Sequence, residues 1–307
     1  MPNICVVGSA NLDLNTYTAR FPAPGETVHG NRFTTGYGGK GANQAVMAAR
    51  LGGRVSFIAR VGTDLFGRDM IEHFRGEGMD TRFVIPTPGT STGTAVITVD
   101  AAGQNTIVVT PGANGLLTAA DVEAARTAIE SARVLVCQQE VPVEANLAAM
   151  RIASRAGVPV VYNPAPVGEG IPDEAYQLAA VLCPNEHEAA LLTGRAASEN
   201  AVAEMAKELL ARGTRSVVIT RGKAGCFVVS TAGELAEVAA PAVTAVDTTG
   251  AGDAFIGSLA YFLARGEELV ESARRAVGIA SISVQFPGTQ TSFPRAADLP
   301  RGLLNPS

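Results

Sequence analysis

The sequence predicts an α/β protein with a central, mostly parallel sheet sandwiched between helices and a small β-sheet lid. Short apolar runs rich in β-branched residues recur along the chain, and alanine-rich segments of helical character separate them. This alternation is typical of parallel sheets, because each crossover between parallel strands places a helix on a face of the sheet. No repeat, low-complexity tract or linker divides the chain. Residues 1–307 are therefore assigned to one domain.

The order of the predicted elements follows from these runs. Buried strands are predicted at 4–7, 55–59, 134–138, 158–162, 181–183 and 217–220. Helices are predicted at 42–51, 66–77, 118–131, 143–156 and 199–212. In such sheets, ligands bind beyond the carboxyl ends of the strands. The candidate binding residues are therefore those that follow the runs: Asn11, Asp13, Glu140, Asn163, Asn185, Gly222 and the segment 247–253.

Two stretches, at about 14–35 and 92–111, break the alternation. Runs of apolar residues and threonine at 94–100 and 106–109 flank a turn at 101–104, which predicts antiparallel strands. We expect the two stretches to form a lid over the site. An exposed edge or face of such a lid is a candidate contact between two copies of the chain, so a homodimer is expected.

Bulk composition excludes several classes of function. A formal net charge of -5 at pH 7 provides no positive field for nucleic acid or anionic membranes. No apolar run reaches the ~18 to 20 residues of a membrane span and no leader pattern is recognised, so a cytoplasmic protein is expected. The four cysteines lie far apart in apolar runs without metal-ligand spacing. This pattern predicts buried thiols rather than disulfides or a transition-metal site.

The segment 246–255 carries the strongest chemical signal. An apolar run gives way to Gly250, Ala251 and Gly252, and Asp253 then opens a helix-like stretch. Glycines at a helix N-terminus let bare backbone N–H groups converge on an anion, which the helix dipole also favours. A carboxylate there can take a proton from a hydroxyl while the amides hold the phosphoryl group. The pattern predicts phosphoryl transfer to an alcohol, although a glycine-rich helix start with a capping aspartate has the same local form.

A second glycine-rich segment, at 36–45, lies near the other end of the chain. Its glycines permit close approach of a ligand, and Lys40 and Asn43 offer a charge and an amide for hydroxyls or phosphate oxygens. It is not a Walker A loop, because Thr34 stands where glycine is required and Gly41 replaces the hydroxyl residue after the lysine.

Two rival patterns lack the context they need. The GTSTG run at 89–93 fits the nucleophile elbow of a serine hydrolase, but it follows a turn and leads into a strand. The glycines of 250–252 do not form a dinucleotide fingerprint, because Phe255 stands where the third glycine belongs.

Five short motifs follow one another along the chain: GSANLD at 8–13, PGET at 24–27, GGKGANQA at 38–45, PNEHE at 184–188 and DTTGAGD at 247–253. In this order they resemble the ribokinase-like (PfkB) carbohydrate kinases, and the resemblance runs from about residue 3 to residue 294. It implies an enzyme that transfers phosphate from Mg-ATP to the primary (5-)hydroxyl of a sugar.

The resemblance also assigns roles to individual residues. Asp253 would be the general base, with the amides of Gly250, Ala251 and Gly252 as the anion hole. Sugar contacts would come from Asn11, Asp13, Gly39, Lys40, Asn43, Glu140 and Asp253. Nucleotide contacts would come from Asn185, Glu188, Thr220, Gly222, Gly225, Gly252 and Val277, with Mg²⁺ reached from Asn185 and Glu188 through water. A monovalent cation such as K⁺ would be held by Asp247, Thr249, Ser283, Phe286, Gly288 and Ser292, mostly through carbonyl oxygens.

Some of these residues also have a purely structural interpretation. Asn185 could cap the helix that follows it, and Gly225 could serve a hairpin. Phe286 and Pro287 depart from the basic residues that the family commonly has there, which a carbonyl ligand tolerates.

The expected acceptor is D-ribose. Within the resemblance, Asn11 meets the 2-hydroxyl of the sugar, and leaving such an amide unpaired costs about 1 to 3 kcal/mol. A 2-deoxyribose kinase is the alternative, since 13–18 and 288–292 look somewhat like that branch, and other sugar or nucleoside acceptors stay open. A non-catalytic sugar-binding regulator is the alternative of another class, but such a protein would lose the base, which is present as Asp253.

Overall fold

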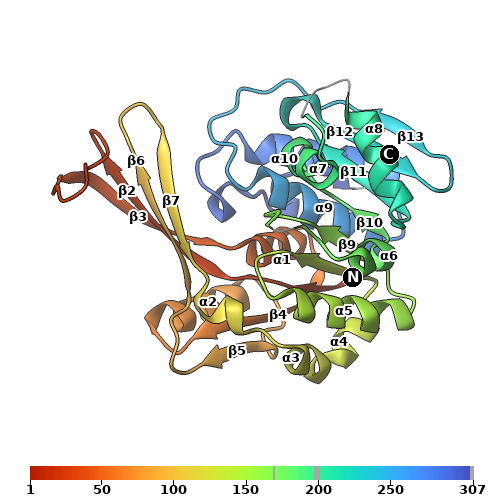
Figure 1. The fold of residues 1–307 in the computed structure, drawn as a ribbon, viewed down its shortest axis with the longest axis horizontal. Coiled ribbons are helices and arrows are strands. Elements are labelled where there is room, and N and C mark those ends of the chain that lie inside the picture. Colours follow the sequence, from red (N-terminus) through yellow and green to blue (C-terminus); the bar gives the residue numbers. More distant parts are fainter. Residues whose placement is uncertain (169, 197–200, 305–307) are drawn as a thin grey trace.

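The computed structural model describes residues 1–168, 170–196 and 201–304. A nine-stranded sheet runs through the body of the molecule, and a smaller sheet projects from it (Figure 1). The order of the large sheet is β13-β12-β11-β10-β9-β8-β1-β4-β5. Neighbours from β5 to β11 are parallel, and β12 and β13 continue the sheet antiparallel. The strands are β1 (Asn3–Val7), β4 (Arg54–Gly62), β5 (Val84–Thr87), β8 (Val134–Gln138), β9 (Val160–Asn163), β10 (Val181–Leu182), β11 (Ser216–Thr220), β12 (Cys226–Ser230) and β13 (Leu235–Val238).

Helices cover both faces of this sheet, and each face has its own apolar core. In β1, Ile4 and Val6 belong to one core while Cys5 and Val7 belong to the other, because successive side chains of a strand point to opposite faces. The first core is covered by α1 (Lys40–Arg50), α2 (Leu65–Gly76), α9 (Ala251–Ala264) and α10 (Leu269–Ser283). The second is covered by α3 (Ala119–Ala124), α4 (Arg126–Glu130), α5 (Val143–Arg155), α6 (Asp173–Leu178), α7 (Glu186–Thr193) and α8 (Val202–Ala211). The short α11 (Arg301–Leu304) packs on α10.

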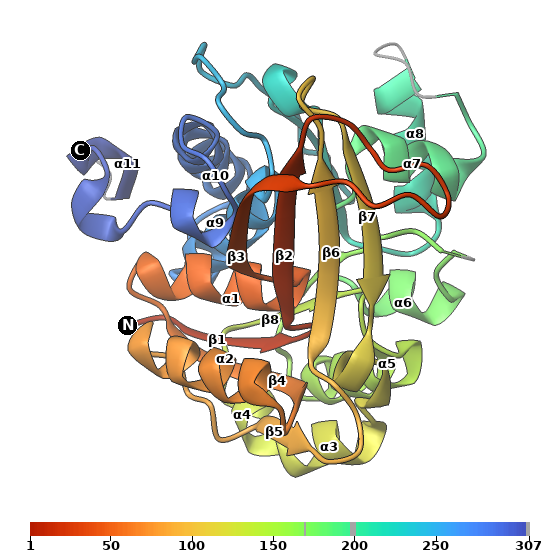
Figure 2. The ribbon, with the colours of Figure 1, turned by 90° about the vertical axis from the view of Figure 1, so that its left-hand side faces the viewer.

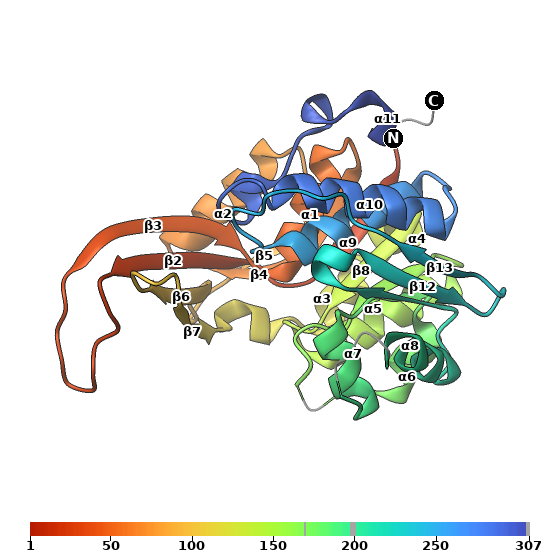
Figure 3. The same ribbon diagram turned by 90° about the horizontal axis from the view of Figure 1, so that it is seen from above.

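The projecting sheet, which we call the lid, has the order β3-β2-β6-β7 (Figure 2). Its strands are β2 (Asn11–Thr18), β3 (Gly30–Gly38), β6 (Gly93–Val99) and β7 (Asn105–Thr110). The pairs β2–β3 and β6–β7 are antiparallel, and a parallel β2–β6 contact joins them. Seen from above, β2 and β3 extend well beyond the helices of the body (Figure 3).

Both faces of the lid expose aliphatic side chains, and one of them also carries Asn11 and Asp13. Asp13, Ala95 and Val109 are paired across the strands, so their side chains share one face with Asn11. The next row, Leu14, Val96 and Val108, points to the opposite face. Val96 and Val108 are exposed there, at 45% and 65%, and Val109 on the first face is 54% exposed.

The predicted strands and helices of the body are confirmed, with two differences. The helix predicted at 118–131 is two helices, α3 and α4, which meet at Ala125. No glycine or proline marks this break, so the sequence gives no sign of it. The helix predicted at 199–212 is seen as α8 from Val202, and residues 199 and 200 lie outside the described residues.

The cysteines and the helices bear on two further expectations. All four cysteines are buried free thiols, as predicted. Within the described ranges, no helix has the length and apolar character needed to cross a membrane.

Close backbone contacts place the start of α1 against the end of β1. A Cβ on Gly41 would lie 2.6 Å from the Ser9 nitrogen, and one on Gly8 would lie 2.8 Å from the Gly41 Cα. Only glycine fits at such an approach. The loop from β1 into the lid and the first turn of α1 therefore meet in one place, which positions the site.

Candidate active site

The predicted base lies at the start of α9. Gly250 precedes this helix in the left-handed conformation, with φ of 76°, and Ala251, Gly252 and Asp253 form its first turn. A Cβ on Gly250 would come within 2.6 Å of the Thr289 methyl carbon, so the turn requires glycine for space as well as for conformation. Asp253 is 7% exposed. A buried carboxylate of this kind must be compensated by hydrogen bonds or charge.

That compensation comes from two neighbouring residues of α1. Asn43 donates from Nδ2 to Oδ2 of Asp253 at 2.9 Å, and Gln44 donates from Nε2 to Oδ1 at 2.9 Å. Gln44 is itself held, because its Oε1 accepts a bond of 2.8 Å from Gln138 Nε2. Its Nε2 also lies 3.2 Å from Oδ1 of Asn163. Hydrogen bonds to an ionised carboxylate are stronger than those between neutral groups, so Asp253 is fixed in one orientation.

A cavity of about 190 Å³ opens in front of this carboxylate. It brings together eight of the residues predicted to bind a ligand: Lys40, Asn163, Asn185, Glu188, Thr220, Gly250, Gly252 and Asp253. The negative charge of Asp253 raises the pKa of Lys40, and burial opposes this effect. Lys40 is therefore a cation at neutral pH beside a proton acceptor and a helix N-terminus, an arrangement that suits a negatively charged phosphoryl group.

The predicted sugar contacts lie at the junction of β1, the lid and α1. Glu140 accepts from the Ser9 hydroxyl at 2.5 Å and from the Lys40 backbone N–H at 2.9 Å. Asn11 uses its Oδ1 to accept a bond of 2.7 Å from Asn114, which leaves the N–H₂ group of Asn11 as the donor for a ligand. Gly39, with φ of 88°, immediately precedes α1.

Asp13 lies on the same lid face as Asn11 and has an unusual proton affinity. Burial, followed by the negative charges of Glu140 and Asp253, raises the pKa of Asp13 to about 7. This clustering of carboxylates is costly without a ligand, because like charges at close range oppose ionisation. Sugar hydroxyls that donate to these oxygens would relieve that cost.

Of the residues predicted to bind the nucleotide, some line the cavity and others have a structural role in their own element. Asn185 and Glu188 form a reciprocal cap at the start of α7, with both bonds at 2.8 Å, so their structural interpretation is realised. Both also line the cavity, and burial raises the pKa of Glu188. Gly225 stands where a Cβ would lie 1.9 Å from the Val238 carbonyl, which the β12–β13 hairpin explains. Gly222 begins a short 3-10 turn before β12, and Val277 is buried in α10.

The six residues predicted to hold a monovalent cation come from two segments that Asp247 joins. Its Oδ1 accepts from the Thr249 N–H at 2.9 Å and its Oδ2 accepts from the Gly288 N–H at 2.8 Å. Burial acts against ionisation, but these bonds hold the pKa of Asp247 below its usual value. Ser283 ends α10, Phe286 and Gly288 follow it, and Ser292 ends the 3-10 turn η4 (Gln290–Ser292). In the described ranges, no group of three or more His, Cys, Asp or Glu side chains is placed to hold a metal ion.

Several residues around the base had no predicted role. Gln44 supports Asp253, Ser9 supports Glu140 and Asn114 supports Asn11. Gln44 lies inside a recognised motif and could have been suspected from its place beside Asn43. Asn114 could not, because 103 positions separate it from Asn11 and nothing in the sequence links the two.

The fold and this site together define a class, the α/β phosphotransferases that act on a small alcohol. The model of the pfkB family carbohydrate kinases matches residues 1–296, and the chain belongs to this family. Ribokinase from Mus musculus is 44% identical over 305 residues, which cover 98% of this chain and 94% of that one. Deoxyribokinase from Salmonella typhimurium is 36% identical over 294 residues, covering 95% of each. The solved structure of Arabidopsis thaliana ribokinase complexed with ribose and ATP has a TM-score of 0.92 at 31% identity, covering 100% of this chain and 99% of that one.

These findings confirm the resemblance seen in the sequence. The protein is an ATP-dependent carbohydrate kinase of the pfkB family.

The raised pKa of Asp13 predicts a pH-dependent stability. Between the ordinary pKa of 3.8 and the folded-state value of about 7, the folded protein holds a proton that the unfolded chain has lost. The contribution of this group to stability therefore declines as pH rises from about 4 to about 7. Urea unfolding at about pH 5 and about pH 8 should show a larger loss of stability in the natural protein than in Asp13→Asn. Equal losses in the two proteins would contradict the assignment.

Proposed function

We propose that this protein transfers the γ-phosphate of ATP to the 5-hydroxyl of D-ribose, giving ADP and D-ribose 5-phosphate. One observation carries the proposal. The side-chain amides of Asn43 and Gln44 hold the carboxylate of Asp253, which lies in the helical turn that follows the left-handed Gly250. This carboxylate lines a cavity that Lys40 also lines. A proton acceptor and main-chain donors thus face one space, as transfer of phosphate to an alcohol requires. The named relatives, including the ribokinase complexed with ribose and ATP, support the choice of substrates.

The chemistry assigns each group one task. Asp253 takes the proton of the sugar hydroxyl as its oxygen attacks the γ-phosphorus, and the bond from that phosphorus to the bridging oxygen of ADP breaks. The amides of Gly250 and Gly252, which line the cavity, donate to the phosphoryl oxygens that gain charge. The Ala251 N–H, which donates to the Thr248 carbonyl at 3.2 Å, would exchange that bond for a phosphoryl oxygen when the anion binds. Lys40 neutralises part of that charge. Asn11, Asp13, Gly39, Asn43 and Glu140 orient the sugar so that its primary hydroxyl meets the base.

The nucleotide side completes the proposal. Asn185, Glu188 and Thr220 line the cavity next to the phosphate position, with Gly222, Gly225 and Val277 assigned to the rest of the nucleotide site. The carboxylate of Glu188 and the amide oxygen of Asn185 suit a hydrated Mg²⁺, since this ion prefers oxygen ligands and retains water. When bound, Mg²⁺ supplies charge neutralisation of the ATP phosphates.

We propose that a monovalent cation, K⁺, binds between the two segments that Asp247 joins through its hydrogen bonds to Thr249 and Gly288. Their donor set consists of oxygens, namely the carboxylate, the Ser292 hydroxyl and backbone carbonyls, which suits a large and weakly hydrated ion. When bound, the ion would order the turn before Asp253.

Ribose is preferred to 2-deoxyribose because of Asn11. The side-chain oxygen of Asn11 accepts a hydrogen bond from Asn114, so the N–H₂ group of Asn11 is left to donate to a ligand. The 2-hydroxyl of ribose would accept that hydrogen bond. A deoxy-sugar would leave that donor unpaired. The deoxyribokinase relative keeps 2-deoxyribose as the second candidate.

We also propose a cytoplasmic location, which cell fractionation would test. In addition, we propose that two copies of the chain form a homodimer through the lid. The row of Leu14, Val96 and Val108 faces away from the site, and Val96 and Val108 expose apolar surface that a second copy would cover.

Replacing the base tests the reaction itself. Asp253→Asn should lower kcat by about 10²- to 10⁴-fold while KM for ribose changes little, because the general base acts only during transfer. ADP release and ribose 5-phosphate would be measured together across ribose, 2-deoxyribose, fructose, sugar phosphates and nucleosides. Ribose should give the highest kcat/KM. If the natural protein bound sugar without forming ADP, a non-catalytic regulator would be favoured instead. Activity confined to nucleosides would show that the acceptor is a nucleoside rather than ribose.

Removing the acidic cation ligand tests the ion. Turnover of the natural protein should rise when KCl replaces tetramethylammonium chloride at equal ionic strength, and Asp247→Ala should lose this response. Equal rates of the natural protein in the two salts would refute the cation site.

Charging the outer lid face tests the dimer. Sedimentation should give a dimer for the natural protein and a monomer for the double variant Val96→Asp, Val108→Asp, because buried charges in an apolar contact are costly. Val243→Asp, at a residue that is 40% exposed outside the lid, is the control and should stay dimeric.

A further inference from the structure

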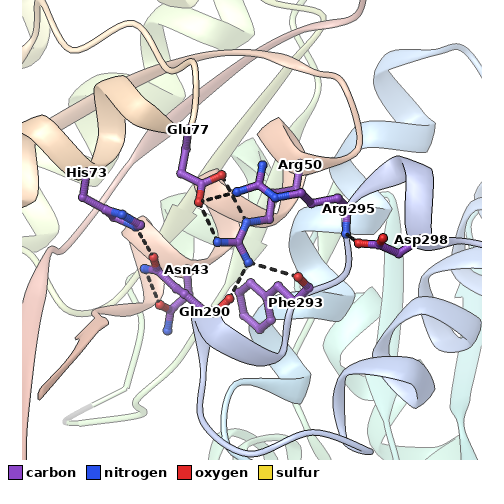
Figure 4. A network of polar contacts seen from close by, with 8 residues as sticks. All are labelled: Asn43, Arg50, His73, Glu77, Gln290, Phe293, Arg295 and Asp298. Carbon is purple, nitrogen blue, oxygen red and sulfur yellow. Dashed lines mark hydrogen bonds and ion pairs between the residues drawn. The ribbon is translucent and has the colours of Figure 1, made fainter. Parts of the chain in front are cut away.

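A chain of side-chain hydrogen bonds leads from α2 to the predicted base. His73 Nε2 lies 2.7 Å from Gln290 Oε1, and Gln290 Nε2 donates to Asn43 Oδ1 at 2.9 Å. Asn43 then donates from Nδ2 to Asp253 at 2.9 Å. Figure 4 shows the first three residues pointing toward one another from three separate elements. His73 is in α2, Gln290 begins η4, Asn43 is in α1 and Asp253 is in α9.

The direction of every bond in this chain is dictated by its last member. An ionised carboxylate only accepts, so Asn43 must turn its N–H₂ group toward Asp253. The Asn43 oxygen then faces Gln290, which must offer its own N–H₂ group. The Gln290 oxygen consequently faces His73, which must carry a proton on Nε2. Reversing any one amide would place two acceptors against each other.

The outer part of the chain is held firmly. The ring of His73 stacks on Tyr37 at 3.9 Å between centroids and 7° between planes. The backbone carbonyl of Gln290 accepts from the Arg50 guanidinium, which also donates to the Phe293 carbonyl at 3.0 Å. Arg50 is paired with Glu77 at 2.6 Å, and their side chains are only 10% and 6% exposed (Figure 4). Gln290 is thus fixed both through its backbone and through its side chain.

We propose that His73 and Gln290 are positioning residues for catalysis, which set the orientation of the Asn43 amide and thereby fix the carboxylate of Asp253. This proposal rests on the proposed function, in which Asp253 is the base. Neither residue lines the cavity. Their effect reaches the reaction only through Asn43, which holds Asp253 and is also a proposed sugar contact. Turning its amide should therefore lower the rate of transfer and, to a smaller extent, weaken the binding of sugar.

An isosteric pair of substitutions at the far end of the chain tests this role. The side-chain amide of His73→Gln can place an N–H donor where Nε2 lies, whereas His73→Glu has the same shape and only accepts. We expect His73→Gln to keep kcat within about threefold of the natural protein. His73→Glu should turn both amides, direct the Asn43 oxygen at Asp253 and lower kcat by about tenfold to a hundredfold, with a smaller rise in KM for ribose.

Two further variants separate this effect from charge and from folding. Arg295→Met removes one positive charge beside Glu77 without touching the chain, so it matches the charge change of His73→Glu and should leave kcat within about twofold. Gln290→Glu is the second test, because it preserves shape while removing the donor to Asn43, and it should lower kcat as His73→Glu does. Thermal melting would identify a variant that does not fold.

The orientation of Asn43 can also be followed without any turnover. The side-chain N–H₂ signals of Asn43 in ¹⁵N-asparagine-labelled protein should shift in His73→Glu and Gln290→Glu, and remain in place in His73→Gln and Arg295→Met. Failure of the natural protein to phosphorylate ribose would refute the proposed function, while these signals would still decide the positioning role. Equal kcat in His73→Gln and His73→Glu, a loss confined to KM, or unmoved Asn43 signals would each overturn the proposal.

Discussion

A buried carboxylate that accepts one amide on each oxygen is the constraint on which the rest of this site depends. Asp253 and its two donors are more than 200 positions apart in sequence, so α9 and α1 must pack closely for the bonds to form. Gly257 permits this approach, because a Cβ there would lie 2.5 Å from the Gln44 carbonyl oxygen. The large sheet, which α1 and α9 cover side by side, serves as the platform that holds the two helices at this spacing.

The second organising feature is the segment that follows α10. The Gln290 side chain of this segment donates to Asn43, which in turn holds the base Asp253. Thr289 of the same segment packs on the turn before the base, and its methyl carbon leaves space only for glycine at position 250. Asp247 ties the same segment to the start of that turn. Three independent contacts therefore converge on a few residues, and the buried Arg50–Glu77 pair secures the segment from behind. Breaking a buried ion pair is costly, so this anchor is rigid.

The sequence predicted the architecture and the local chemistry, but not the contacts between distant residues. Alternating apolar and helical runs were sufficient for six strands of the nine-stranded sheet, but the edge strand β5 and the antiparallel strands β12 and β13 were not predicted. Gly250 and Asp253 were recognisable because a helix start binds anions by local geometry alone. The support of Asp253 by Gln44, and the positions of Gln290 and His73, depend on packing between helices that no short pattern encodes. The break at Ala125 was invisible for another reason: its neighbours are all good helix formers, and the two helices separate without a breaking residue.

Strand β2 belongs to two surfaces at once. Asn11 and Asp13 face the sugar site, while Leu14 lies on the apolar outer row of the lid. Because side chains alternate along a strand, inserting or deleting a single residue early in β2 would exchange the two sets, placing the amide of Asn11 and the carboxylate of Asp13 outside and turning Leu14 inward. A change of length by one residue in this strand would therefore need a bulge to restore the alternation, as the register shift between Tyr17 and Thr18 does further along β2. Ligand recognition and the chemistry of the outer surface are thus coupled through one strand.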